Sequence, residues 1–160
     1  MLTIDRNNLY ASEDSVTSAL LAEEVDLIKA KYPNKLRFVN KHLGNTLFNQ
    51  IVELGLIQFQ FMSFVPTHNV KSQRYEISDA NGLRAWLDTF SIQDSTEIFI
   101  CPQYGTEKSQ CISLPWHVIK EECAMLLGLE YGKDDTTLFD ETGRWVLLYN
   151  HNDYIDFATF

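Results

Sequence analysis

The chain has 160 residues, of which 45% are apolar and 22% are charged, so we expect one folded domain over residues 1–160. Its formal net charge of -9 repels phosphate backbones and anionic lipid, which argues against nucleic-acid and membrane partners. No apolar run reaches the ~18 residues of a membrane helix, and the N-terminal residues lack the pattern of a secretory signal. We therefore expect a cytoplasmic protein whose three cysteines, Cys101, Cys111 and Cys123, are free thiols.

Two helices are predicted in the first third of the chain. Apolar residues recur at helical spacing over residues 12–34 and again over residues 40–55. Gly55 suits the left-handed position that follows a helix, so it marks the end of the second one. Gly44 weakens the start of this second helix, which can instead begin at Asn45.

A strand with one buried face is predicted next. Over residues 56–65, the apolar side chains of Ile57, Phe59 and Phe61 alternate with glutamines, which is the pattern of a half-buried strand. A polar loop then leads to a second strand over residues 74–78. If the apolar side chains of the first strand were exposed, they could instead be buried against a second copy of the chain, so a homo-oligomer is possible.

The rest of the chain predicts two more helices and five more strands. The helices are expected over residues 78–90 and 115–128. The strands are expected over residues 96–102, 110–114, 136–140, 144–149 and 154–158. If the first two of these strands form a hairpin, Cys101 and Cys111 lie near each other across it. Gly143 permits the positive φ that a tight turn between later strands requires.

This order of elements is not a strict alternation of strands and helices, which argues against a wholly parallel sheet. No internal repeat, low-complexity segment or long linker divides the chain. We therefore predict an α+β fold, a single domain with a mainly antiparallel sheet and about four helices packed on one of its faces.

Motifs of several common enzyme classes are absent from the sequence. Neither usual glycine-rich nucleotide loop is present, and there is no GxSxG serine elbow. A cysteine nucleophile would need a base, but His117 and Cys123 point in different directions from one predicted helix. His117 and Glu121 share a helix face, yet a zinc site needs further ligands. We predict a non-catalytic protein without cofactor or metal. The alternatives are a small hydrolase or transferase whose site carries no motif, and a regulatory or homo-oligomeric structural subunit.

Negative charge is concentrated near the C-terminal end. Residues 134–160 carry six acids and one base, and the acids lie at or near predicted turns with Trp145 and two tyrosines between them. Tight turns bring sequence neighbours together, so we expect these groups to share one rim that binds a protein partner. The alternative is that the acids solvate the turns and Trp145 fills the core. The predicted partner-binding residues are Asp134, Asp135, Asp140, Glu141, Tyr149, Asp153, Tyr154 and Asp156.

The same segment resembles the closing strands of small acidic immunity proteins from bacteria. Phe139 and Asp140 are followed by a turn with Gly143, then by Trp145 and a strand that begins at Tyr154 with mixed aromatic and acidic residues. The resemblance implies a cytosolic inhibitor that binds a toxin domain and blocks its active site. Many such toxins are basic nucleases, which an acidic partner would complement.

Overall fold

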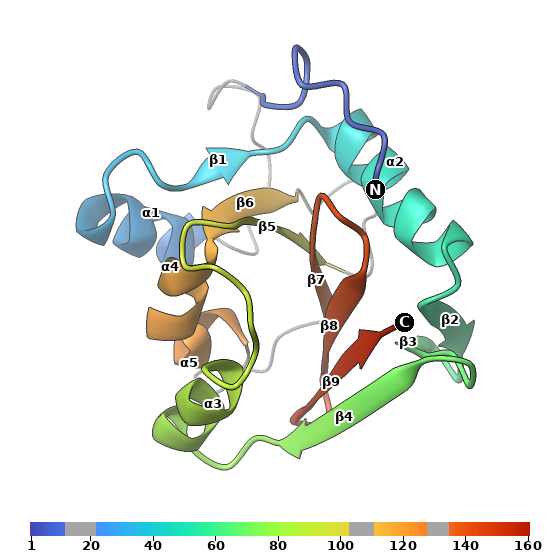
Figure 1. Ribbon diagram of the computed structural model, residues 1–160. Coiled ribbons are helices and arrows are strands. Elements are labelled where there is room, and N and C mark those ends of the chain that lie inside the picture. Colours follow the sequence, from blue (N-terminus) through green and yellow to red (C-terminus); the bar gives the residue numbers. More distant parts are fainter. Residues whose placement is uncertain (12–21, 103–110, 128–134) are drawn as a thin grey trace.

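The computed structural model describes residues 1–11, 22–102, 111–127 and 135–160 (Figure 1). Its centre is a seven-stranded sheet with the order β1-β6-β5-β7-β8-β9-β4, in which all neighbouring strands are antiparallel. These strands are β1 (Arg37–Phe38), β4 (Lys71–Glu76), β5 (Glu97–Pro102), β6 (Ile112–Pro115), β7 (Thr136–Asp140), β8 (Trp145–Asn150) and β9 (Tyr154–Thr159). A separate hairpin pairs β2 (Ile57–Gln60) with β3 (Ser63–Pro66). The predicted α+β fold with a mainly antiparallel sheet is confirmed.

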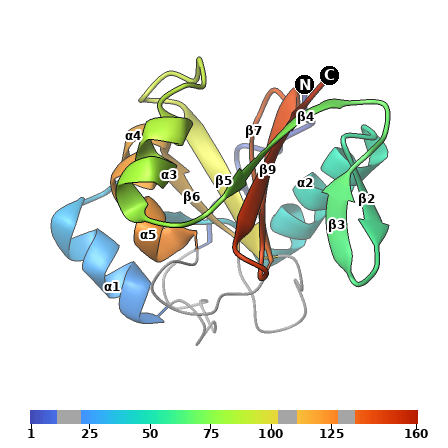
Figure 2. The ribbon, with the colours of Figure 1, turned by 90° about the horizontal axis from the view of Figure 1, so that it is seen from below.

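Helices cover both faces of the sheet. They are α1 (Ala22–Lys31), α2 (Lys41–Glu53), α3 (Ala80–Leu87), α4 (Trp116–Glu121) and α5 (Cys123–Leu126). In Figure 2, α1, α3, α4 and α5 lie on one side of the sheet, whereas α2 and the β2–β3 hairpin lie on the other. The prediction that the helices pack on one face is therefore wrong. The reason is that β5 enters two cores, with Ile98 and Ile100 in one and Phe99 and Cys101 in the other.

The helix predicted over residues 115–128 is interrupted at Glu122. Its backbone leaves the helical region at φ −104° and ψ 22°, so α4 and α5 are two short helices. This break accounts for five helices among the described residues, where about four were predicted. None of the helices in the described ranges is long and apolar enough to cross a membrane. Residues 12–21 of the first predicted helix and residue 128 lie outside the described ranges.

The start of α2 is set by a side-chain cap. The side-chain oxygen of Asn40 accepts hydrogen bonds from the backbone N–H groups of His42 at 3.0 Å and Leu43 at 3.4 Å. The helix therefore begins at Lys41, within the predicted range of residues 40–55, and the alternative start at Asn45 is wrong. At the other end of α2, the glycine predicted to follow the helix has φ +80°, as expected.

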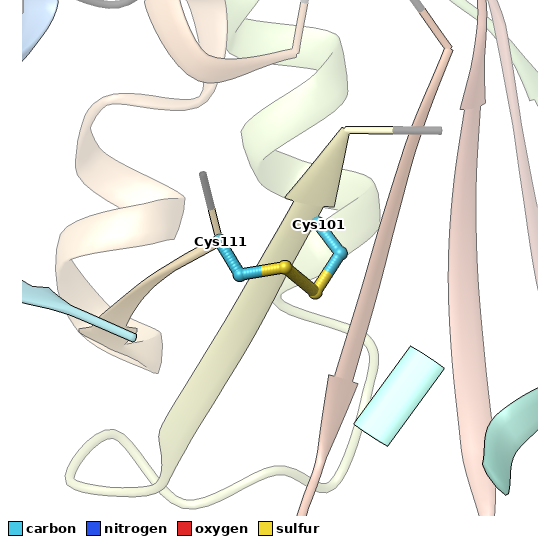
Figure 3. Close-up of a disulfide and its surroundings, with 2 residues drawn as sticks. All are labelled: Cys101 and Cys111. Atoms are coloured by element: carbon cyan, nitrogen blue, oxygen red, sulfur yellow. A yellow bond between two sulfur atoms is a disulfide. The ribbon is translucent and has the colours of Figure 1, made fainter. Parts of the chain in front are cut away.

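The hairpin of β5 and β6 carries a disulfide between Cys101 and Cys111 (Figure 3). Ile100 is paired with Ile112, so the next cross-strand position brings the two cysteines together, and their Cα atoms are 4.5 Å apart. The predicted proximity is confirmed, whereas the expectation of free thiols is wrong for this pair. Cys123 is free and buried.

Candidate interaction surface

The predicted acidic residues lie at two opposite ends of the sheet. The five residues of β7 separate Asp135, at its start, from Asp140 and Glu141, at its end, by roughly 17 Å of strand. Antiparallel pairing places Tyr149 and the turn between β8 and β9 at the Asp135 end. Asp134 lies outside the described residues. The single rim that the sequence predicts is therefore not formed by the residues that the structure describes.

At the first end, Asp140 holds the β7–β8 turn together from inside. It is only 6% exposed, and its Oδ2 accepts a hydrogen bond of 2.9 Å from Trp145 Nε1. Its Oδ1 accepts from both the backbone N–H, at 2.9 Å, and the hydroxyl of Thr142. The carboxylate thus satisfies an indole N–H that burial would otherwise leave without a partner. The neighbouring Glu141 forms an ion pair with Arg6 of the N-terminal segment.

Along β9, Asp156 is neutralised by the chain itself. It is 4% exposed and accepts two hydrogen bonds of 2.8 Å from Nε and Nη2 of Arg74 in β4, which raise the pKa of Arg74. The same guanidinium lies 3.9 Å from the ring centroid of Tyr154, a cation–π contact. The negative charge of Asp156 is therefore balanced by Arg74 of the neighbouring strand.

Burial removes half of the predicted binding residues from the surface. The buried members are Asp135, Asp140, Tyr149 and Asp156. Carboxylates tolerate burial when neighbouring donors hydrogen-bond them, and sequence spacing does not reveal those donors. Of the remaining described members, Glu141 is paired with Arg6, Asp153 is exposed and Tyr154 is partly exposed.

At the second end, Asp135 joins β3 to the β8–β9 turn. It is 2% exposed, and its Oδ1 accepts a hydrogen bond of 2.7 Å from the backbone N–H of His151 and lies 2.7 Å from His151 Nδ1. Its Oδ2 accepts a hydrogen bond from the hydroxyl of Ser63, the first residue of β3. Asn150 Nδ2 also donates to Ser63 Oγ at 3.2 Å. This network fixes the start of β3 against the end of β8.

A serine, a carboxylate and an imidazole meet in this network, but not in the order of a serine hydrolase. In such enzymes the imidazole lies between the serine and the carboxylate. Here the hydroxyl of Ser63 and the imidazole of His151 both bond to Asp135, so the imidazole is not placed to take the serine proton through this contact. The arrangement is instead that of a structural tie.

The other groups weighed as catalytic candidates are also held in separate places. Cys123 Sγ faces the carbonyl of Ala80 at 3.9 Å, and burial raises the pKa of its thiol, which disfavours the thiolate. His117 Nδ1 lies 3.1 Å from the carbonyl oxygen of Asp94. Within the described ranges, no group of three or more His, Cys, Asp and Glu residues could hold a metal ion.

The β2–β3 hairpin replaces the single strand predicted over residues 56–65. Gln60 pairs with Ser63, so Phe61 and Met62 alone form the turn. Their φ angles are +48° and +70°, which is the left-handed region that both positions of a type I′ turn require. Large L side chains rarely adopt this region, and it costs about 1–2 kcal/mol per residue. The turn is therefore a strained part of the backbone.

The same turn exposes large apolar side chains. Phe61 is 91% exposed, Met62 is 75% exposed and Phe59 is 61% exposed. The predicted buried face is therefore wrong for Phe59 and Phe61, and only Ile57 of that set is buried. The hairpin turns back before the strand can continue, so the alternation of apolar residues does not follow one face of the main sheet. Phe64 holds the hairpin from within, since its ring packs edge-on against Phe59 at 5.3 Å.

Strain, apolar exposure and a firm anchor thus coincide at one end of the molecule. The anchor is Ser63, which follows the strained turn directly and bonds to Asp135 and Asn150. It places the hairpin tip beside the exposed residues of the β8–β9 turn. We call this region the tip surface, and it consists of Phe59, Phe61, Met62, His151, Asn152 and Asp153.

The turn that forms the tip surface was missed at the level of sequence, although Phe59 and Phe61 were named as side chains that a second copy could bury. A type I′ turn is normally marked by Asn-Gly or Asp-Gly, whereas this one is formed by Phe61 and Met62 and carries no turn signal. Of the predicted binding residues that the structure describes, Asp153 alone is fully exposed. No family model matches the chain, and no curated protein matches it in sequence.

Proposed function

We propose that this protein is a non-catalytic interaction protein that binds and neutralises a bacterial toxin domain, as immunity proteins do, through the tip surface. The observation that carries the proposal is the turn of Phe61 and Met62, in which two large apolar side chains are mostly exposed at positive φ. Both features disfavour the free protein. A partner that covers these side chains would recover roughly 2 kcal/mol for each fully buried one.

The chemistry of the partner follows from charge. The chain has a net charge of -9, and the exposed Asp153 lies at the same end of the sheet as the apolar tip. A complementary surface would have an apolar recess for Phe61 and a cationic rim, as a basic nuclease domain would provide. The apolar anchors would then set the dissociation rate, and the charges would mainly accelerate association.

The apolar part of the proposal is tested with Phe61→Ser. The binding partner in this test is the toxin domain that the proposal expects to be encoded next to this chain, and affinity is measured by calorimetry. We expect the dissociation constant to rise at least tenfold, about 1.4 kcal/mol. The matched control is Leu27→Ser, which removes an apolar side chain of 62% exposure from α1, on the other side of the sheet. Equal effects of the two variants would refute docking through the tip surface.

The charged part is tested with Asp153→Lys against Asp26→Lys, an equal charge reversal at an exposed position of α1. Only the first should slow association, by about threefold to tenfold at low salt, with the difference shrinking as salt screens the charges. Association rates that respond equally to both reversals would indicate steering by net charge alone. In that case the tip surface would not be the cationic partner's contact.

Two other roles make different predictions. If the tip surface instead joins two copies of this chain, light scattering at micromolar concentration gives a dimer that Phe61→Ser converts to a monomer. If the protein is a hydrolase or transferase, the exposed imidazole of His151, whose Nδ1 lies 2.7 Å from Asp135 Oδ1, is a candidate general base for a bound substrate. Protection of cells from the toxin that persists in His151→Ala would argue against that enzymatic role.

We also propose that the protein acts in the cytoplasm, where an inhibitor would meet an incoming toxin. The disulfide of Cys101 and Cys111 argues against a cytoplasmic location, because reducing compartments keep most thiols free. Alkylation of the cysteines in freshly lysed cells distinguishes a reducing compartment from an oxidising one. A fully oxidised pair in the native host would favour an oxidising compartment.

A further inference from the structure

An open cavity lies beside the β7–β8 turn, at the opposite end of the sheet from the tip surface. Its volume is about 420 Å³, and its lining comes from residues 89–96, the β7–β8 turn and β9. Phe90, Phe157 and Trp145 form an aromatic wall in which neighbouring rings are stacked, with centroid distances of 3.9 Å and 5.7 Å. A cavity of this size and composition fits one small aromatic molecule.

The rest of the lining is polar and retains hydrogen-bonding capacity. The side chains of Ser91, Gln93 and Thr96 form no hydrogen bond within the described part of the chain. Arg144 is exposed, and its guanidinium has no ion pair among the described residues. Asp140 also lines the cavity, but both its oxygens are engaged by the β7–β8 turn. The cavity therefore combines aromatic rings with an exposed cation, Arg144, and a buried carboxylate, Asp140, whose oxygens are already hydrogen-bonded.

We propose that this cavity is a binding site for a planar aromatic carboxylate. The ring of the ligand packs against the wall of Phe90, Phe157 and Trp145, and its carboxylate pairs with Arg144, which is the only exposed cation in the lining. A neutral ring leaves Arg144 without a counter-charge, and an aromatic cation is repelled by it. The site shares no residue with the tip surface, so the proposal is independent of the proposed function.

Three probes separate the contributions of the ring and the charge. Benzoate carries both, benzamide keeps the ring without the charge, and cyclohexanecarboxylate keeps the charge without the aromatic ring. Binding is followed by protein NMR, with the indole N–H resonance of Trp145 as the local reporter. We expect benzoate to bind at least about tenfold more tightly than either relative.

Arg144→Gln should weaken benzoate binding by about tenfold, whereas Arg84→Gln, at an exposed arginine of α3 outside the lining, should leave it within about twofold. The proposal is overturned if benzoate at about 10 mM shifts no resonance of the cavity. It is also overturned if benzamide binds equally well or if Arg144→Gln binds benzoate like the unaltered protein.

Discussion

The β7–β8 turn and the β2–β3 turn both place residues at positive φ, but with different side chains. In the first, the residue at φ +61° is Gly143, which is buried, and Asp140 hydrogen-bonds the rest of the turn. In the second, the residues at positive φ are Phe61 and Met62, which are mostly exposed. The first turn therefore agrees with the preferences of its residues, and the second contradicts them.

This difference separates a turn that serves the fold from one that is a candidate for function. Local choices that agree with the global structure stabilise it, whereas local conflicts that persist tend to lie at functional sites. The conflict at Phe61 and Met62 persists because the next residue, Ser63, is hydrogen-bonded to Asp135 and Asn150. The comparison predicts opposite responses to substitution at the two ends of the sheet.

The largest effect is expected at Trp145, beside the β7–β8 turn. Its ring is 7% exposed, packs against Phe157 and donates to the buried Asp140. Trp145→Ala should lower the free energy of unfolding by about 3–5 kcal/mol, because it leaves a cavity and an unsatisfied carboxylate. Urea denaturation measures this change, with Phe61→Ala as the control at the exposed tip. A loss below about 1 kcal/mol for Trp145→Ala would mean that this end of the sheet does not hold the core.

The sequence predicts the parts of the molecule in which local and global preferences agree. Short runs rich in apolar, aromatic and β-branched residues mark β5, β7, β8 and β9, and Gly143 and Gly55 occupy the positive-φ positions expected of them. The contact between Cys101 and Cys111 follows from the predicted hairpin of the two strands that carry them. In each case a short-range signal is sufficient, because the tertiary structure only reinforces it.

The sequence fails where tertiary contacts decide the outcome. The turn at Phe61 and Met62 has no turn residue, so the alternation around it predicts a continuous strand. The acids of the C-terminal segment have the sequence pattern of solvated turn residues, but two of them are buried and hydrogen-bonded. Asp140 accepts from Trp145, which is near in the sequence, whereas Asp156 accepts from Arg74, which is far away in the sequence. Four of the eight predicted binding residues are therefore buried, and Asp153 is the member of that set that belongs to the tip surface.

Substitution of the β2–β3 turn should stabilise the fold, whereas most substitutions destabilise a protein. Replacing Phe61 with Asn and Met62 with Gly supplies the preferred residues of a type I′ turn, so the free energy of unfolding should rise by about 1–2 kcal/mol. The same variant should lose affinity for the toxin domain, because both apolar anchors are gone. Urea denaturation and calorimetry on one preparation measure the two changes together.

The matched control for this turn is Gly143→Ala. It introduces a side chain at φ +61° whose Cβ would lie 2.8 Å from Leu54 Cδ1, so it should destabilise the fold by about 1–2 kcal/mol. If the doubly substituted tip also destabilised the fold, its apolar side chains would be serving the protein's own core. The contrast between the two turns would then disappear.

The smallest effect concerns Tyr149, at the tip-surface end of the sheet. Burial raises the pKa of its hydroxyl, and the nearby carboxylates of Asp153 and Asp135 raise it further. Below pH ~10 the phenol is neutral in both the folded and the unfolded chain. Above that pH the unfolded chain ionises first, so stability falls as pH rises toward the folded-state pKa. Tyr149→Phe removes this contribution and should lose less stability than the unaltered protein between pH 8 and pH 11, by at most about 1 kcal/mol.

Asp153→Asn sharpens this last measurement, because it removes one of the two carboxylates that oppose ionisation of Tyr149. The alkaline loss of this variant should lie between those of the unaltered protein and Tyr149→Phe. The other phenols with raised pKa values, Tyr10 and Tyr32, are present in all three proteins, so their share of the loss cancels in the comparison. Identical alkaline profiles for all three proteins would mean that the hydroxyl of Tyr149 is as free to ionise in the folded chain as in the unfolded one. The exposed carboxylate of Asp153 would then be too well solvated to act on its buried neighbour, and it would be equally weak as a contact for a cationic partner.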